Sequence, residues 1–88
     1  MNQSRILLYG KLKAFTPKGE ILINTFKEMT PNILREEVAK KLKSFNPDFG
    51  GILELKSSAI ANDLRILSEK EPIGDGKEFS FLPPVCGG

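Results

Sequence analysis

The sequence of 88 residues contains no histidine and no tryptophan, and Cys86 is its only cysteine. Without histidine, the chain cannot form a serine–histidine or cysteine–histidine nucleophile pair, and most zinc sites are excluded as well. A single cysteine excludes an internal disulfide, as is typical of proteins from a reducing compartment. We therefore expect a cytoplasmic protein that is not catalytic on its own and that binds no metal and no stable cofactor.

The charge balance and the short apolar runs argue against nucleic acid and membranes as partners. Thirteen basic and 11 acidic residues leave a net charge of +2, an excess too small to predict a nucleic-acid surface. No apolar run is long enough to cross a bilayer or to form a signal peptide. A phosphate loop of the GxxxxGK(S/T) type is also lacking. We expect neither nucleic acid nor a membrane among the partners.

The N-terminal part of the chain predicts a β-hairpin. Residues 5–9 are nearly all apolar and predict a central strand, and residues 20–26 predict its hairpin partner after a turn at Pro17-Lys18-Gly19. Residues 11–15 predict a single turn of helix. Side chains of the second strand are expected to alternate between the two faces of the sheet. One face would carry Ile21, Ile23 and Thr25, and the other would carry Leu22, Asn24 and Phe26.

A helix is predicted to begin at Thr30-Pro31, because a hydroxyl caps the first turn and proline needs no donor there. It is predicted to end before Pro47. The core side of this helix is expected to carry an apolar stripe formed by Leu34, Val38, Leu42 and Phe45. Its solvent side is expected to carry two ion pairs, Glu36 with Lys40 and Glu37 with Lys41.

The remaining sequence predicts three more strands. Residues 58–61 and 64–67 are expected to form a second hairpin around Asn62-Asp63, and residues 77–82 the last strand. The order strand, strand, helix and three strands predicts an α+β fold of the ubiquitin-like β-grasp type, with a mixed sheet packed on one main helix. In that topology the last strand is central and parallel to the first. We expect a domain over residues 1–82 and an extended tail over residues 83–88.

The tail has the composition of a stiff projecting arm. Two prolines fix backbone angles in Leu82-Pro83-Pro84 and favour an extended form. The last two residues, Gly87 and Gly88, have no Cβ and therefore fit a channel too narrow for other residues. The terminal carboxylate is unreactive until another protein activates it, for example by joining it to AMP.

The ending Phe81-Leu82-Pro83-Pro84-Val85-Cys86-Gly87-Gly88 resembles the C-terminus of the small subunit of molybdopterin synthase, a ubiquitin-fold sulfur carrier. In that family an aromatic residue, two prolines and a valine come just before Gly-Gly. The turn Gly74-Asp75-Gly76 ahead of the last strand is also similar to the family's sequence at that point. The tail motif is specific, whereas the rest of the chain resembles the family only in its fold.

The resemblance implies a mechanism and a set of partners. A ubiquitin-activating-type adenylyltransferase would use ATP to adenylate the carboxylate of Gly88, and sulfur from a sulfurtransferase or persulfide donor would then form a thiocarboxylate. The charged carrier would dock on the large subunit of molybdopterin synthase and give its sulfur to a pterin precursor. In this assignment Gly87 clears the channel, while Pro83, Pro84 and Val85 hold the tail extended.

The resemblance also implies an apolar docking face for a partner, formed by Phe79, Phe81, Leu82, Pro83, Pro84 and Val85. We expect one of the two phenylalanines to fill the core and the other to lie exposed beside the tail.

Several alternatives stay open from the sequence. Cys86 is either a reactive thiol near the adenylate or a small neutral side chain that lines a channel. The same Gly-Gly chemistry serves carriers for thiamine or another thiolated product. The same chemistry also serves ubiquitin-like modifiers that are linked to lysines. The remaining possibility is a plain interaction domain whose tail has no function.

Overall fold

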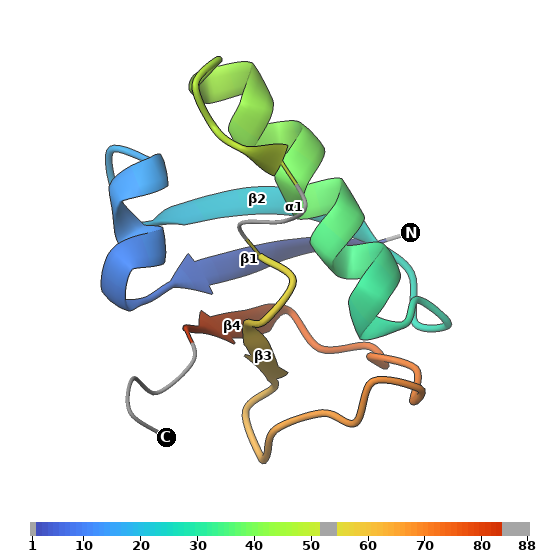
Figure 1. The fold of residues 1–88 in the computed structure, drawn as a ribbon. Helices are drawn as coiled ribbons and strands as arrows, with labels where there is room; N and C mark the ends of the chain where they lie inside the picture. The colour runs from blue at the N-terminus through green and yellow to red at the C-terminus, as the bar shows by residue number, and fades with distance from the viewer. Residues whose placement is uncertain (1, 52–54, 84–88) are drawn as a thin grey trace.

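The computed structural model describes residues 2–51 and 55–83, and residues 1, 52–54 and 84–88 lie outside this description. The described residues form four strands, one 3₁₀ helix (η1) and one α-helix, and Figure 1 shows α1 lying across one face of the sheet. In chain order the elements are β1 Asn2–Leu8, η1 Gly10–Phe15, β2 Glu20–Thr25, α1 Pro31–Phe45, β3 Ala59–Ala61 and β4 Glu78–Leu82.

The sheet has the strand order β2-β1-β4-β3. β1 pairs antiparallel with β2 and parallel with β4, and β3 pairs antiparallel with β4. The predicted central position of the last strand, parallel to the first, is therefore confirmed. This arrangement of a mixed sheet and one main helix also confirms the predicted α+β class.

The face of the sheet that meets the helix is the one that the alternation of β2 predicts. Ile21, Ile23 and Thr25 are buried, while Leu22 and Asn24 are exposed. Thr25 is buried at low cost because its hydroxyl and that of Ser4 on β1 are hydrogen-bonded at 2.6 Å. The core therefore lies between this face and α1.

Helix α1 begins where predicted, with the Thr30 hydroxyl accepting a hydrogen bond from the Ile33 N–H at 3.5 Å. The predicted stripe is fully buried at its first three positions, Leu34, Val38 and Leu42, but its last member was wrongly assigned to the core. Phe45 is 53% exposed.

Phe49 occupies the core near this end of the helix instead. After the helix stops at Phe45, the chain turns, and the Phe49 side chain is only 1% exposed. Its ring meets the ring of Phe15 edge to face, with 4.8 Å between centroids. Because the loop fills this space, Phe45 is left at the surface, with the Lys41 ammonium 5.8 Å from its ring centroid.

Lysines on the solvent side of α1 pair differently from the prediction. Lys40 forms an ion pair with Glu37, three residues earlier, at 3.1 Å, rather than with Glu36 four residues earlier. Lys41 lies over Phe45 rather than on Glu37. Exposed ion pairs of this kind differ little in energy, so spacing alone does not select one of them.

The predicted strand 64–67 was wrong. Only an isolated bridge joins Ala61 to Ile66. The Asn62 side-chain oxygen accepts hydrogen bonds from the N–H groups of Leu64 and Arg65, at 2.8 and 2.9 Å. Backbone hydrogen bonds from the Asn62 N–H to the Arg65 oxygen, at 3.0 Å, and from the Leu67 N–H to the Ile60 oxygen, at 2.8 Å, still join the two arms. The predicted turn is therefore present, but no regular returning strand follows it.

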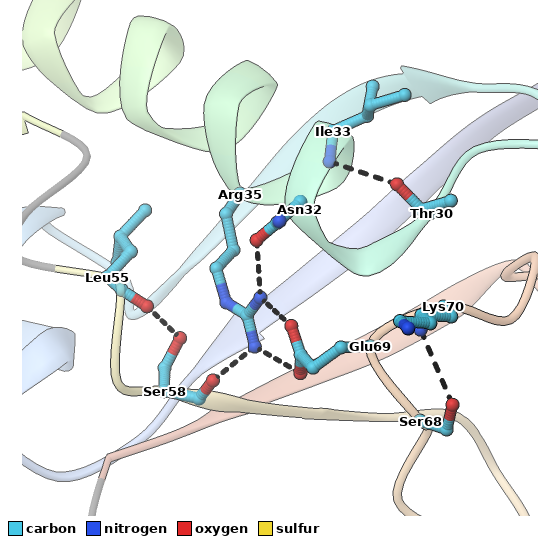
Figure 2. A network of polar contacts seen from close by, with 9 residues as sticks. All are labelled: Thr30, Asn32, Ile33, Arg35, Leu55, Ser58, Ser68, Glu69 and Lys70. Atoms are coloured by element: carbon cyan, nitrogen blue, oxygen red, sulfur yellow. Dashed lines mark hydrogen bonds and ion pairs between the residues drawn. The ribbon is translucent and has the colours of Figure 1, made fainter.

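Arg35, which the sequence analysis did not single out, fastens α1 to two distant segments (Figure 2). The residue is only 3% exposed. Its guanidinium makes a bidentate ion pair with Glu69 and donates to the Ser58 carbonyl oxygen. A donor with a planar fork suits this task, because it satisfies a carboxylate and a carbonyl together. Residues 58 and 69 are thereby held against the helix.

A second ion pair shapes the connection before β4. The Arg65 guanidinium binds the Glu71 carboxylate, which also accepts a hydrogen bond from the Ser68 N–H at 2.6 Å. The bond from Arg65 is the largest cause, and the two together lower the pKa of Glu71 from 4.5 to about 2.

Truncation of a core residue on β4 should unfold the domain more readily than truncation on the open face. Phe81→Ala is expected to lower the free energy of unfolding by about 3–5 kcal/mol, because Phe81 is fully buried. Leu22→Ala, at a side chain that is 50% exposed, should change it by less than about 1 kcal/mol. Urea denaturation measures both, and similar losses would contradict the core assignment.

Stability is expected to fall in acid through the Glu71 carboxylate. A carboxyl group with a lowered folded-state pKa contributes stability above its unfolded pKa, and this contribution is lost as the pH falls from about 4.5 to about 2. Glu71→Gln should flatten the fall in melting temperature over this range. Glu36→Gln, at an exposed helix position, should leave the fall unchanged. Equal slopes for Glu71→Gln and the unmodified chain would contradict the assignment.

Candidate functional site

Most of the predicted functional tail lies outside the described residues. This applies to Pro84, Val85, Cys86, Gly87 and Gly88. Their assigned roles, and the boundary between domain and tail, therefore stay predictions. The structure does describe Pro83, the first residue after β4, and with it the point at which the tail leaves the sheet.

Phe79 and Phe81 do not form an exposed docking face, and the prediction that one of them lies exposed beside the tail was wrong. Both side chains are 0% exposed. The physical reason is the period of the strand: residues two apart share a face, and β4 is central, so that face is covered by the core. These residues hold the strand in place instead of contacting a partner.

Leu82 lies on the opposite face of β4 and is half-buried, as is Pro83. The sheet register brings other apolar side chains next to it. Leu82 pairs with Ala59 on β3, and Leu7 on β1 pairs with Ser80. On the other side of β4, Tyr9 follows β1 in an extended conformation, donates its N–H to the Phe81 carbonyl oxygen at 3.3 Å and is 45% exposed.

We name this surface the tail-root patch; its members are Leu7, Tyr9, Ala59, Leu82 and Pro83. They come from β4 and the chain at both of its neighbours, and they lie at or near the end of β4, after which the tail begins. Figure 1 shows β4 between β1 and β3. An apolar surface in this place suits protein contact, because the tyrosine supplies a large amphipathic ring and the remainder supplies apolar area.

The same sheet face also carries a charged cluster. The Arg5 guanidinium on β1 lies 3.8 Å from the Glu20 carboxylate on β2 and 3.4 Å from the Glu78 carboxylate on β4. Glu20 pairs in register with Leu7, so this cluster borders the tail-root patch on the β2 side.

Gly10 supports the root of the tail from the side of β1. Its φ angle is +60°, a conformation that side chains disfavour. A Cβ at this position would lie 2.7 Å from Cγ of Pro83. The proline ring thus packs directly on the backbone of residue 10.

Sequence reasoning found Leu82 and Pro83 but missed Leu7, Tyr9 and Gly10. The alternation within residues 77–82 already separates Leu82 from the two phenylalanines. The parallel register that brings the end of β1 beside the end of β4 is a long-range feature, and local pattern does not reveal it.

Within residues 2–51 and 55–83, no group of three or more histidine, cysteine, aspartate or glutamate side chains could hold a metal ion. Within the same residues, no helix is long and apolar enough to cross a membrane.

Comparison with known proteins identifies the fold. No family model and no curated protein sequence matches the chain. Among solved structures, the protein assigned as molybdopterin converting factor subunit 1 of Pyrococcus furiosus is similar, with 18% identity, a TM-score of 0.66 and coverage of 97% of this chain and 100% of that one.

Two further structures are similar over nearly the whole chain. Small archaeal modifier protein 1 of Haloferax volcanii has 14% identity and a TM-score of 0.63, over 97% of this chain and 100% of that one. A chain from the complex of subunits 1 and 2 of the molybdopterin-converting factor of Helicobacter pylori has 24% identity and a TM-score of 0.52, over 99% and 100%. The chain has the ubiquitin-like β-grasp fold, as predicted.

Proposed function

We propose that this protein is a sulfur carrier whose Gly88 carboxylate is adenylated, converted to a thiocarboxylate and used to donate sulfur in molybdopterin synthesis. In this role it is the small, non-catalytic subunit of the synthase. The observation that supports the proposal is the direct passage of a central strand, paired with a neighbour on each side, into Pro-Pro-Val-Cys-Gly-Gly at an apolar rim. A carrier needs such a rigid base for a group that another protein must reach.

The dimensions of the tail suit delivery into an enclosed site. Residues 83–88, fully extended, span roughly 20 Å at ~3.3 Å per residue. Gly87 and Gly88 end this span without side chains. Such an end can enter a channel that excludes other residues and lets the carboxylate reach groups deep within a partner.

The proposed chemistry has two steps at the Gly88 carboxylate. Its oxygen attacks the α-phosphorus of ATP, pyrophosphate leaves, and an acyl-adenylate forms in the active site of a ubiquitin-activating-type adenylyltransferase. Hydrosulfide then attacks the acyl carbon. With hydrosulfide, a C–S bond forms, the C–O bond to AMP breaks and a thiocarboxylate remains. With a persulfide donor, the outer sulfur attacks and AMP leaves; a second thiol then cleaves the resulting acyl disulfide, so that the donor becomes a disulfide and the thiocarboxylate is released. ATP is thus a substrate of the activating partner.

The tail-root patch is the proposed contact with the large subunit. It surrounds the exit of the tail, so a partner that covers the patch also receives the tail. A comparable pairing exists among proteins of this fold, because the Helicobacter pylori structure is a complex of subunits 1 and 2. Tyr9 is the expected anchor, since exposed aromatic residues often carry a large share of interface energy.

A protein-modifier function is the second candidate. It is favoured by the similarity to small archaeal modifier protein 1 of Haloferax volcanii. In that case the Gly88 acyl group would be transferred to a lysine amine rather than to sulfur. Carriers for thiamine or another thiolated product share the first candidate's chemistry and differ only in the acceptor.

The proposal predicts a change of mass at Gly88. The chain is incubated with a ubiquitin-activating-type adenylyltransferase from the same organism, ATP and a sulfide donor, and its intact mass is taken. One oxygen should be replaced by one sulfur, and deletion of Gly88 should abolish the change without altering the melting temperature. A ladder of lysine conjugates would support the modifier instead. An unchanged mass, or activation of the truncated chain, would refute carboxylate activation.

The tail-root patch predicts a selective loss of partner binding. Tyr9→Ala should weaken binding to the large synthase subunit by about ten-fold or more. This corresponds to a loss of about 1–2 kcal/mol of binding free energy. Leu64→Ala is the matched control, because Leu64 is 89% exposed but belongs to the loop after β3. Calorimetric titration measures both affinities. An equal or larger loss with Leu64→Ala would place the interface elsewhere.

A further inference from the structure

A side chain at Gly10 would collide with Pro83, the first residue of the tail. A Cβ at residue 10 would lie 2.7, 3.6 and 3.7 Å from Cγ, Cδ and Cβ of Pro83. The first of these distances is far below van der Waals contact. A side chain at residue 10 and the present position of the proline ring are therefore incompatible.

We infer that Gly10 is a positioning residue, which fixes the direction in which the tail leaves the sheet and hence where the terminal carboxylate is delivered. This inference deepens the proposed carrier function and rests on it for its catalytic consequence. The geometric part, that Gly10 sets the direction of the tail, stands without it.

β4 is held by strand pairing on both sides, so a new side chain at residue 10 is expected to move the proline ring rather than the strands. Leu8 pairs with Phe81 in the parallel ladder, and the Tyr9 N–H donates to the Phe81 carbonyl oxygen at 3.3 Å. β3 holds the other side of β4 through the pair of Ala59 and Leu82. A new Cβ at residue 10 cannot easily push either strand away, so it displaces Pro83.

Displacement of a proline ring changes the course of the chain, unlike displacement of a flexible side chain. The ring includes the backbone nitrogen and fixes φ, so moving it turns the residues that follow. At Gly19, by contrast, a Cβ would meet only the Lys13 side chain. A lysine side chain can change rotamer without moving any backbone.

The length of the tail magnifies a small change at its root. The five residues beyond Pro83 span roughly 17 Å when extended, so a tilt of about 20° would move their end by about 6 Å. A misplacement of about 1 Å can cost about a hundred-fold in rate. A partner that holds both the domain and the tail would thus have to force Pro83 back against the new side chain.

The direction of the tail is measured directly with a spin label on Cys86, the only cysteine of the chain. Paramagnetic broadening of backbone amide signals then reports which surface the label approaches. Gly10→Ala should shift the broadened set of amides relative to the unsubstituted labelled chain. Gly74→Ala should leave it unchanged, because Gly74 also has a positive φ, +80°, but no atom within 4 Å of a Cβ.

A companion substitution separates the steric contact from backbone strain. Pro83→Ala removes Cγ, the nearest atom, so adding Gly10→Ala in that background should produce little further shift. If Gly10→Ala does not fold, Gly10→Asn replaces it, because asparagine tolerates a positive φ better and still carries a Cβ. The geometric inference would be overturned if the same amides were broadened in the unsubstituted chain, the Gly10 variant and the Gly74 variant. It would also be overturned if the Gly10 and Gly74 variants shifted the broadened set equally.

The catalytic consequence is tested with the same variants in the thiocarboxylate assay. Gly10→Ala should slow thiocarboxylate formation by about ten-fold or more, while Gly74→Ala stays near the unsubstituted rate. A shifted label with an unaltered rate would overturn the positioning role. No sulfur transfer even by the unsubstituted chain would refute the proposed function, and the label experiment would still decide the geometry.

Discussion

The parallel pairing of β1 with β4 is the constraint on which the rest of the structure depends. It places the last strand at the centre of the sheet, with β1 on one side and β3 on the other. The chain therefore reaches Leu82 while it is still held by backbone hydrogen bonds on both sides. Whatever follows Pro83 begins from a fixed point rather than from a fraying end.

This central strand serves two purposes on its two faces. Phe79 and Phe81 are fully buried against the helix side and tie the strand to the core. Leu82, one residue from Phe81, faces the other way and joins the surface that Tyr9 and Ala59 extend. A substitution on one face thus acts on stability and a substitution on the other on contact, so the two properties can be separated experimentally.

Local pattern predicted the elements whose causes are local and missed those whose causes are distant. The cap at Thr30 and the alternation of β2 followed from local spacing. The central position of the last strand followed from the topology of the expected fold. The exposure of Phe45 did not, because a stripe cannot show that a later residue, Phe49, fills the same space. The buried Arg35 was missed since its partners are 23 and 34 residues away. For the site, pattern found Leu82 and Pro83, whereas Tyr9 and Gly10 needed the register.

The same parallel pairing separates the two ends of the domain. Because β1 and β4 run in one direction, β1 starts at the rim of the sheet opposite to the one where β4 ends (Figure 1). A purification handle, a fluorescent protein or a surface tether joined ahead of Asn2 would emerge on the side away from Pro83. Such fusions would leave the rim at Pro83 unobstructed, which the proposed carrier function requires.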